Sequence, residues 1–217
     1  MRPRKEMKSR TTDIDQDNAV AEHQKTRERI IASAAQNFAS RGFAGASIRE
    51  IAEQANVKHQ LIAYYYGGKE DLWWAVVERE IDRLLETYSE KDADTNKSDP
   101  RARFQHLVEA FVEYEAKSGT LARLMLQEAL ANSSRYQKLL NHKKLNGAYP
   151  ITRFIDEAHE QGILIDQPVE ELRLNFLGLI THRYMIDLHA SMTLGQPVRS
   201  KEAIKNHAKN IAQMFLR

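Results

Sequence analysis

The chain has 217 residues, of which 42% are hydrophobic and 29% are charged, and its formal net charge is only +2. This composition is ordinary for a globular protein, and no run approaches the roughly 18 apolar residues needed to span a bilayer. The lack of cysteine excludes disulfides, thiolate metal sites and a cysteine nucleophile, and it fits a reducing compartment. We therefore expect a cytoplasmic protein without a secretory signal or a membrane segment.

Residues 1–22 combine a basic stretch with an acidic one and lack apolar periodicity. The sequence therefore predicts a disordered arm, which is either a solvated tail or a basic segment that follows a nucleic-acid backbone. Residues 23–70 hold seven basic and four acidic side chains. A small basic region on a nearly neutral chain favours a nucleic-acid partner, although weakly by itself.

Three short helices are predicted in the region that follows the arm. The first carries an apolar stripe from Ile30 to Phe38 and stops at Gly42, where a glycine suits the end of a helix. The second begins at Ser47, which forms a predicted capping box with Glu50. The third extends over Lys58–Tyr65. The small and apolar residues between the second and third helices predict the tight turn of a helix-turn-helix unit.

The remainder of the chain also predicts helices, separated by loops and without strand-like alternation. The predicted features in chain order are a long helix from Lys69 through Leu85, a polar linker at 92–99, a helix from Pro100 to a break at 118–119, and helices over 121–131, 136–160, 169–192 and 204–215. Pro150 is expected to kink or break the fourth of these helices. The sequence thus predicts an all-α protein with an arm at 1–22, a helix-turn-helix domain at 23–70 and a larger helical domain at 71–217.

At this point several separated motifs, in order and without a gap, resemble the TetR family of bacterial transcriptional regulators. The motifs are TRERII at 26–31, FASRGF at 38–43, SIREIA at 47–52, ANV at 55–57 and YYYGGKEDL at 64–72. The resemblance implies a homodimer that binds a pseudo-palindromic DNA operator. It also implies a C-terminal body that dimerises through its last two long helices and binds a small organic effector. Repression is the family's usual action, and activation is the alternative.

The start of the third helix supplies the predicted base contacts, because a recognition helix reads bases with its N-terminal residues. Gln60 can pair with adenine, Lys58 can reach guanine acceptors, and His59 can donate to a base or a phosphate. The family often has serine where Lys58 stands, so this helix lacks a side chain able to cap it. Ile62 is expected to pack inward, and Tyr66 is also predicted to lie in the core.

Further residues are predicted to contact the DNA backbone. Ser47 and Arg49 lie at the start of the second helix, where free amides and the helix dipole favour a phosphate. Ser47 is alternatively a plain helix cap. Lys69 is similar to the family's phosphate-binding lysine, with an ordinary solvated lysine as the alternative. The hydroxyls of Tyr64 and Tyr65 suit backbone oxygens, although the family often has histidine where Tyr65 stands.

The C-terminal body is rich in apolar and aromatic residues, which either pack in the core and the dimer interface or line an effector pocket. The candidate pocket residues are Trp73, Phe111, Tyr114, Met125, Phe154, Phe176 and His182. Trp73 and Trp74 are adjacent on a helix, so one is expected to pack under the DNA-binding head and the other to face the body.

Other functional classes lack sequence support. The chain contains no nucleophile elbow, no glycine-rich phosphate loop and no zinc-protease motif, and its histidines show no metal-ligand spacing. We therefore expect no enzyme activity, no metal and no cofactor. A non-specific DNA-binding protein is an alternative, but the nearly neutral body provides few phosphate contacts for it. A helical interaction protein that uses the head as a scaffold is a further alternative.

Overall fold

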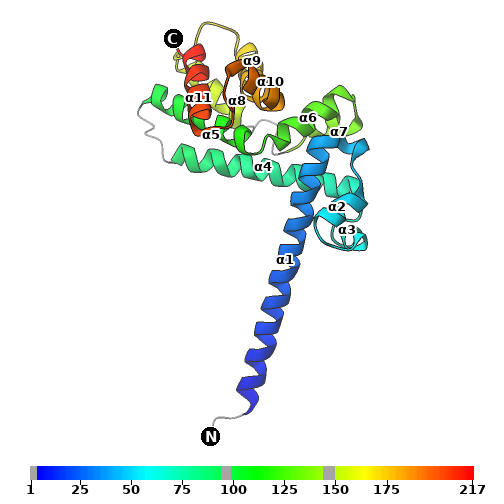
Figure 1. The fold of residues 1–217 in the computed structure, drawn as a ribbon. Coiled ribbons are helices and arrows are strands. Elements are labelled where there is room, and N and C mark those ends of the chain that lie inside the picture. The colour runs from blue at the N-terminus through cyan, green and yellow to red at the C-terminus, as the bar shows by residue number, and fades with distance from the viewer. Residues whose placement is uncertain (1–3, 94–98, 144–149) are drawn as a thin grey trace. The chain divides into compact units, whose positions relative to one another are not determined.

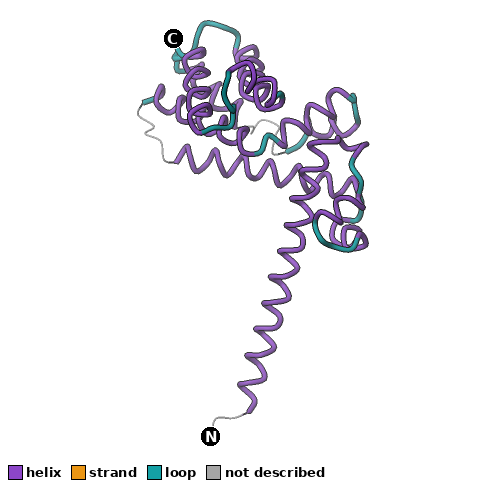
Figure 2. Tube along the Cα trace, viewed as in Figure 1, coloured by secondary structure: helices purple, strands orange, loops and turns teal. Residues whose placement is uncertain are grey.

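The computed structural model describes residues 4–93, 99–143 and 150–217, and every regular element in these ranges is a helix. Figure 2 shows helices joined by loops throughout these ranges. The chain divides into two compact units, Met1–Val76 and Val77–Arg217. The prediction of an all-α protein is confirmed. The boundary between the units falls six residues later than the predicted one, inside a helix, because Leu72, Trp73 and Val76 are all buried.

The N-terminal unit contains α1 (Arg4–Gly45), α2 (Ile48–Gln54), α3 (His59–Tyr66) and the start of α4 (Lys69–Ala93), which Figure 1 labels in chain order. The side chains of Ile30, Phe38, Ile51 and Ile62 are fully buried and join these helices into one core. α3 begins and ends one residue later than the sequence predicted, which is within the usual variation of helix ends.

Residues 4–22, which were predicted to be disordered, form the first part of α1. We predicted disorder because residues 1–22 lack an apolar stripe. Such a stripe indicates that a helix packs against a partner, and its absence does not prevent the backbone from being helical. From Arg4 to Arg41 the chain contains no proline and no glycine, so nothing in it interrupts a helix. The left-handed φ of 71° at Gly42 marks the kink near the end of α1, at the position where the sequence predicted a stop.

The C-terminal unit is built around α5 (Pro100–Lys117), which packs against three later helices. The elements after the shared helix α4 are α5, α6 (Thr120–Leu130), α7 (Ser134–Leu140), α8 (Pro150–Glu160), α9 (Val169–Met185), α10 (Asp187–Leu194) and α11 (Lys201–Phe215). Its core contains a cluster of phenylalanine rings from α5, α8, α9 and α11, whose centroids lie 5.3–6.5 Å apart. None of the helices in the described ranges is long and apolar enough to cross a membrane.

Two of the predicted helices are each divided in two. The segment 136–160 was predicted as one helix that kinks or breaks at Pro150; α7 ends earlier, at Leu140, and Pro150 begins α8. Proline is tolerated at the first position of a helix because its missing N–H would have no partner there. The predicted linker at 92–99 lies mostly outside the described residues, and Asp99 caps α5 by accepting bonds from the amides of Arg101 and Ala102.

The predicted helix over 169–192 breaks at Ile186, whose φ and ψ are −107° and 39°. The carbonyl oxygen of Tyr184 accepts hydrogen bonds from the guanidinium groups of Arg123, at 2.8 Å, and Arg199, at 3.4 Å. Arg199 also pairs with Asp187, at the start of α10. Two cations from distant parts of the sequence thus bind the carbonyl that a continuous helix would use internally, and the helix ends there.

Candidate DNA-binding surface

The turn between α2 and α3 brings the two helices close together. Ala52 and Ala55 are buried at the contact, and the amide of Val57 donates to the carbonyl oxygen of Ala52 at 2.9 Å. Asn56 adopts a left-handed φ of 53°, a conformation that asparagine tolerates better than most residues. The predicted helix-turn-helix layout is therefore present, with small residues at the crossing.

A partly buried polar network holds α1 against α2. The side-chain amide of Asn37 donates to the Gln54 side-chain oxygen at 2.7 Å and to the Ser33 carbonyl oxygen at 3.0 Å. The Ser33 hydroxyl donates to the carbonyl oxygen of Ile51 at 2.9 Å. Sequence reasoning missed these residues, although polar Ser33 and Asn37 recur four positions apart beside buried residues, a spacing that places them on one helix face.

At the start of α2, Ser47 occupies the cap position but makes no capping bond with its side chain. The predicted capping box is wrong, because the Glu50 carboxylate instead pairs with the guanidinium of Arg41 on α1. The ion pair ties α1 to α2 and leaves the Ser47 hydroxyl free of the bond that the box would impose. Arg49, in the first turn of α2, is exposed.

The exposed side of α3 brings together most of the residues predicted to read DNA. Lys58, His59, Gln60 and Tyr64 are all exposed, while Ile62 is buried on the opposite side as predicted. Lys58 precedes α3 without capping it, as the chemistry of lysine requires. No acidic residue lies in the first turn of α3, so no carboxylate there opposes an approaching phosphate.

The remaining predicted DNA contacts lie beside α1. The half-buried Tyr65 ring meets His23 edge-on, with centroids 5.9 Å apart. Tyr66 is half-buried rather than fully in the core, and its hydroxyl donates to the Arg27 carbonyl oxygen at 3.1 Å. The Lys69 ammonium donates to the Ala44 carbonyl oxygen at 3.2 Å, which uses one of its three donors.

The candidate effector residues do not gather at one place. Trp73 is fully buried in the N-terminal unit, where its ring meets Phe43 edge-on. Phe111, Phe154 and Phe176 pack against one another in the core of the C-terminal unit, with centroids 5.3–6.3 Å apart. The sequence left two interpretations open for these residues, core packing and an effector pocket. The positions of the three phenylalanines agree with core packing.

The other three candidate effector residues lie in different surroundings. The Tyr114 hydroxyl donates to the carbonyl oxygen of Glu80 at 3.1 Å. Met125 is half-buried on α6, and His182 is exposed on α9. Tyr114 also lines a polar groove of about 290 Å³ between α4 and α5.

Buried carboxylates in the C-terminal unit escaped sequence reasoning. Glu80 accepts a hydrogen bond from the Ser118 hydroxyl at 2.8 Å and is only 2% exposed. Burial raises the pKa of Glu115 to about 7, against the opposing effect of Arg123 and Arg199. Their positions follow the helical period of α4 and α5, but a charged residue alone carries no sequence signal that it will be buried.

Comparison with known proteins agrees with this geometry. The sequence model of the family described as "Bacterial regulatory proteins, tetR family" matches residues 30–76. The HTH-type transcriptional repressor SCO4008 of Streptomyces coelicolor is 30% identical over 199 residues, which cover 91% of this chain and 98% of the relative. The probable HTH-type transcriptional regulator YttP of Bacillus subtilis is 24% identical over 169 residues, or 78% of this chain and 82% of the relative.

The fold is similar to that of AibR, which was solved in complex with isovaleryl coenzyme A and operator DNA. The TM-score is 0.68, the sequences are 16% identical, and the match covers 88% of this chain and 98% of AibR. At this identity the likeness concerns the fold alone. The family model matches residues 30–76, and SCO4008 aligns with this chain over nearly the whole length of both proteins. These matches and the helix-turn-helix geometry show that the chain belongs to the TetR family and is a helix-turn-helix transcriptional regulator.

Proposed function

We propose that the protein represses transcription by binding a short pseudo-palindromic operator as a homodimer, and that a small organic effector releases it. The observation that carries the proposal is the exposed start of α3, where Lys58, His59 and Gln60 follow one another without an acidic neighbour in the first turn. These side chains can reach the base edges of a major groove, whose donors and acceptors distinguish all four base pairs. Repression is favoured because the relative SCO4008 is a repressor.

Backbone contacts from both helices would fix the position of α3 in the groove. Ser47 at the start of α2 and Tyr64 on α3 offer hydroxyls, and Arg49 and Lys69 offer positive charge. Such contacts set the register on the duplex without reading the sequence. We propose that Lys69 contacts a phosphate while keeping its bond to the Ala44 carbonyl oxygen, because an ammonium has further donors.

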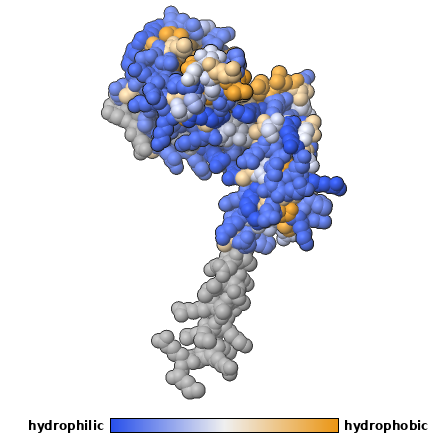
Figure 3. All heavy atoms as spheres, in the orientation of Figure 1, coloured by the Kyte–Doolittle hydropathy of each residue, from blue (hydrophilic) through white to orange (hydrophobic). Residues whose placement is uncertain are grey.

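The homodimer is supported by exposed apolar side chains on α9 and α10. Leu174 and Leu179 on α9 are 66% and 39% exposed, and Leu188 and Met192 on α10 are 78% and 75% exposed. Figure 3 shows hydrophobic side chains gathered on the surface of the C-terminal unit. A second copy would remove these side chains from water. α11 has one large apolar side chain on its exposed side, Met214, so we propose that α9 and α10 supply most of the contact.

An effector is expected to act by favouring one arrangement of the two heads over another. The proposal is supported by AibR, which shares the fold and was solved with isovaleryl coenzyme A as well as operator DNA. We propose an organic ligand that binds in the C-terminal unit of this chain. A screen of organic ligands for loss of operator binding tests this part, and unchanged operator affinity across a broad screen counts against it.

The decisive experiment is operator selection from random duplexes, read by sequencing, with the full-length protein. We expect an enriched pseudo-palindrome. His59→Ala and Gln60→Ala should each relax specificity at defined bases and cost about 1–3 kcal/mol against the enriched site. Gln36→Ala, at an exposed position of α1, is the control and should leave the preference unchanged. Binding that falls steeply with salt but enriches no sequence would replace the proposal with non-specific DNA binding.

The dimer is tested separately by light scattering after size exclusion. Leu188→Glu combined with Met192→Glu should convert the protein to a monomer with an unchanged circular dichroism spectrum, because both side chains are exposed. Leu130→Glu is the matched control and should leave the dimer intact, because Leu130 is 79% exposed but lies on α6, outside the proposed interface. A wild-type monomer at micromolar concentration would refute the homodimer.

A further inference from the structure

A groove of about 500 Å³ lies between α1 and α3 in the N-terminal unit and shares Tyr64 with the recognition surface. Its lining residues are Val20, His23, Gln24, Arg27, Tyr64 and Tyr65. The four residues from α1 recur at the spacing of one helix face. None of these α1 residues belongs to the predicted DNA contacts, so the groove adds a surface that the recognition helix does not provide.

The chemistry of the groove suits a sugar-phosphate chain. Its walls contain one guanidinium and one imidazole but no carboxylate. Two carboxylates of α1 stand next to these residues, and both already have partners. Glu22 lies 3.9 Å from the Lys25 ammonium, and Glu28 accepts a bond at 3.3 Å from the lining residue Gln24, whose amide keeps a second N–H for a phosphate oxygen. The amide and hydroxyl groups of the lining can donate to phosphate oxygens.

The aromatic side chains of the groove are held in place and accessible. The Tyr64 and Tyr65 rings meet edge-on with centroids 5.1 Å apart, and Tyr64 is 72% exposed. The Arg27 guanidinium lies 5.8 Å from the centroid of the Tyr66 ring, while its own backbone carbonyl oxygen accepts a bond from the Tyr66 hydroxyl. These contacts position the charge of Arg27 before any ligand arrives, which lowers the entropy cost of binding.

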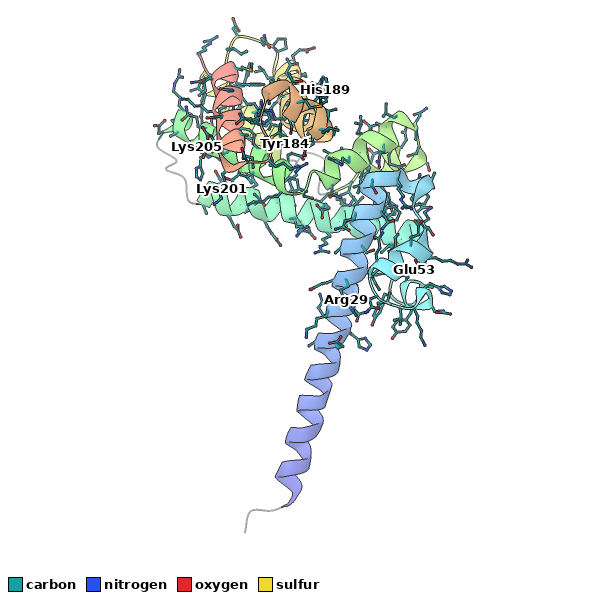
Figure 4. The ribbon with its side chains drawn as sticks, viewed as in Figure 1. Arg29, Glu53, Tyr184, His189, Lys201 and Lys205 are labelled. Carbon is teal, nitrogen blue, oxygen red and sulfur yellow. The ribbon has the colours of Figure 1, made fainter. Side chains whose placement is uncertain are left out.

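The position of Tyr64 connects the groove to the recognition surface. Tyr64 stands one helical turn after Gln60, so the two share a face of α3. A duplex that meets this face of α3 at Gln60 can therefore also reach Tyr64, which is part of the groove. Arg29, labelled on α1 in Figure 4, marks the stretch of the helix that follows the groove.

We propose that the groove between α1 and α3 binds the DNA backbone outside the base pairs read by α3, with His23, Gln24 and Arg27 as a second contact that lengthens the operator. This inference rests on the proposed function, since it requires an operator. It assigns α1 a direct part in DNA binding in addition to its role as a support for α2 and α3.

The test measures the affinity of the full-length protein for two duplexes, the selected operator core and the same core with about five further base pairs on each side. The wild type should bind the longer duplex more tightly. Arg27→Ala and Gln24→Glu should remove this gain while leaving affinity for the core nearly unchanged. Gln24→Glu adds an exposed negative charge to the groove without removing the contact of Arg27 with Tyr66, so it guards against a folding defect.

Lys25→Ala is the matched control, because it removes the same charge from the same helix at an exposed position outside the lining. The slope of log K, the logarithm of the binding constant, against log salt concentration should become less steep by about 0.9 when one phosphate contact is removed. Between low and moderate salt this corresponds to about a threefold smaller loss of affinity. Arg27→Ala should show this change on the long duplex, and Lys25→Ala should not.

The outcomes separate the two proposals. If Gln60→Ala weakens operator binding but Arg27→Ala and Gln24→Glu leave the benefit of the longer duplex intact, the groove does not bind DNA and only this inference fails. An equal effect of Lys25→Ala would also overturn it, because general charge would then explain the loss. If no operator is enriched and Gln60→Ala has no effect, the proposed function itself fails.

Discussion

Replacing Glu115 with glutamine is expected to remove a pH-dependent loss of stability from the C-terminal unit. Glu115 is 8% exposed, and burial raises its pKa from 4.5 to about 7, with Glu80 adding to the rise and Arg123 and Arg199 opposing it. Between these two pH values the folded state holds a proton that the unfolded state has released. The free energy of unfolding therefore falls as pH rises from 4.5 to about 7.

The size of the effect follows from the two pKa values. A rise from 4.5 to about 7 corresponds to ~3 kcal/mol, which the folded protein loses once Glu115 is ionised. Glutamine has nearly the same shape and is neutral at every pH. Arg123 and Arg199 keep partners in the variant, because both donate to the Tyr184 carbonyl oxygen. The variant should therefore be the more stable protein above pH 7.

Urea unfolding followed by circular dichroism at about pH 5, 6, 7 and 8 measures this effect. The difference in unfolding free energy between Glu115→Gln and wild type should grow toward ~3 kcal/mol across this range. His207 contributes the opposite slope, because burial lowers its pKa to about 4 and stability is lost as pH falls from about 6.5 toward this value. That contribution is present in both proteins and cancels.

Glu113→Gln supplies the control, since the Glu113 side chain is 40% exposed and faces Lys91 and Lys117. For Glu113→Gln, the difference in unfolding free energy from wild type should grow much less with pH than it does for Glu115→Gln. A stability difference for Glu115→Gln that is equal at pH 5 and pH 8 would refute the reasoning.

Three further substitutions test contacts inside the two units. Asn37→Ala should lower the unfolding free energy by about 1 kcal/mol, because the Gln54 side-chain oxygen loses a donor that ties α1 to α2; urea unfolding measures it. Arg199→Ala should cost about 2–4 kcal/mol in the same assay, since the carbonyl oxygen of Ala116 loses its charged donor. Gly119→Ala should cost about 1–2 kcal/mol, because φ is +58° and the new Cβ would lie 3.2 Å from a backbone oxygen; thermal unfolding checks it.

Each of these predictions has an outcome that contradicts it. An Asn37→Ala protein as stable as wild type would mean that the network does not hold α1 against α2. For Arg199, Lys201→Ala is a control at an exposed position, labelled in Figure 4, and equal losses would contradict a specific role of the guanidinium. Gly162→Ala is the control for Gly119, because φ there is +66° but nothing lies within 4 Å of the added Cβ. Gly119→Ala should therefore cost more than Gly162→Ala.

The sequence by itself determined the helical class and the recognition unit. The stripe from Ile30 to Phe38, the small residues before Val57 and the glycines after Tyr66 are local signals, and each acts within one or two helical turns. The exposed row Lys58, His59 and Gln60 was predictable for the same reason, because the side of a short helix that carries polar residues is the side left in water.

The tertiary structure decided what depends on distant partners. The break at Ile186 requires guanidinium groups from Arg123 and Arg199, and no pattern within 169–192 encodes their arrival. The groove between α1 and α3 likewise arises from lining residues of the two helices that are 37 or more positions apart in sequence, as with Arg27 and Tyr64. Local propensity and periodicity act through neighbours along the chain, whereas burial of charge, interrupted helices and grooves are set by contacts that form only when distant segments pack.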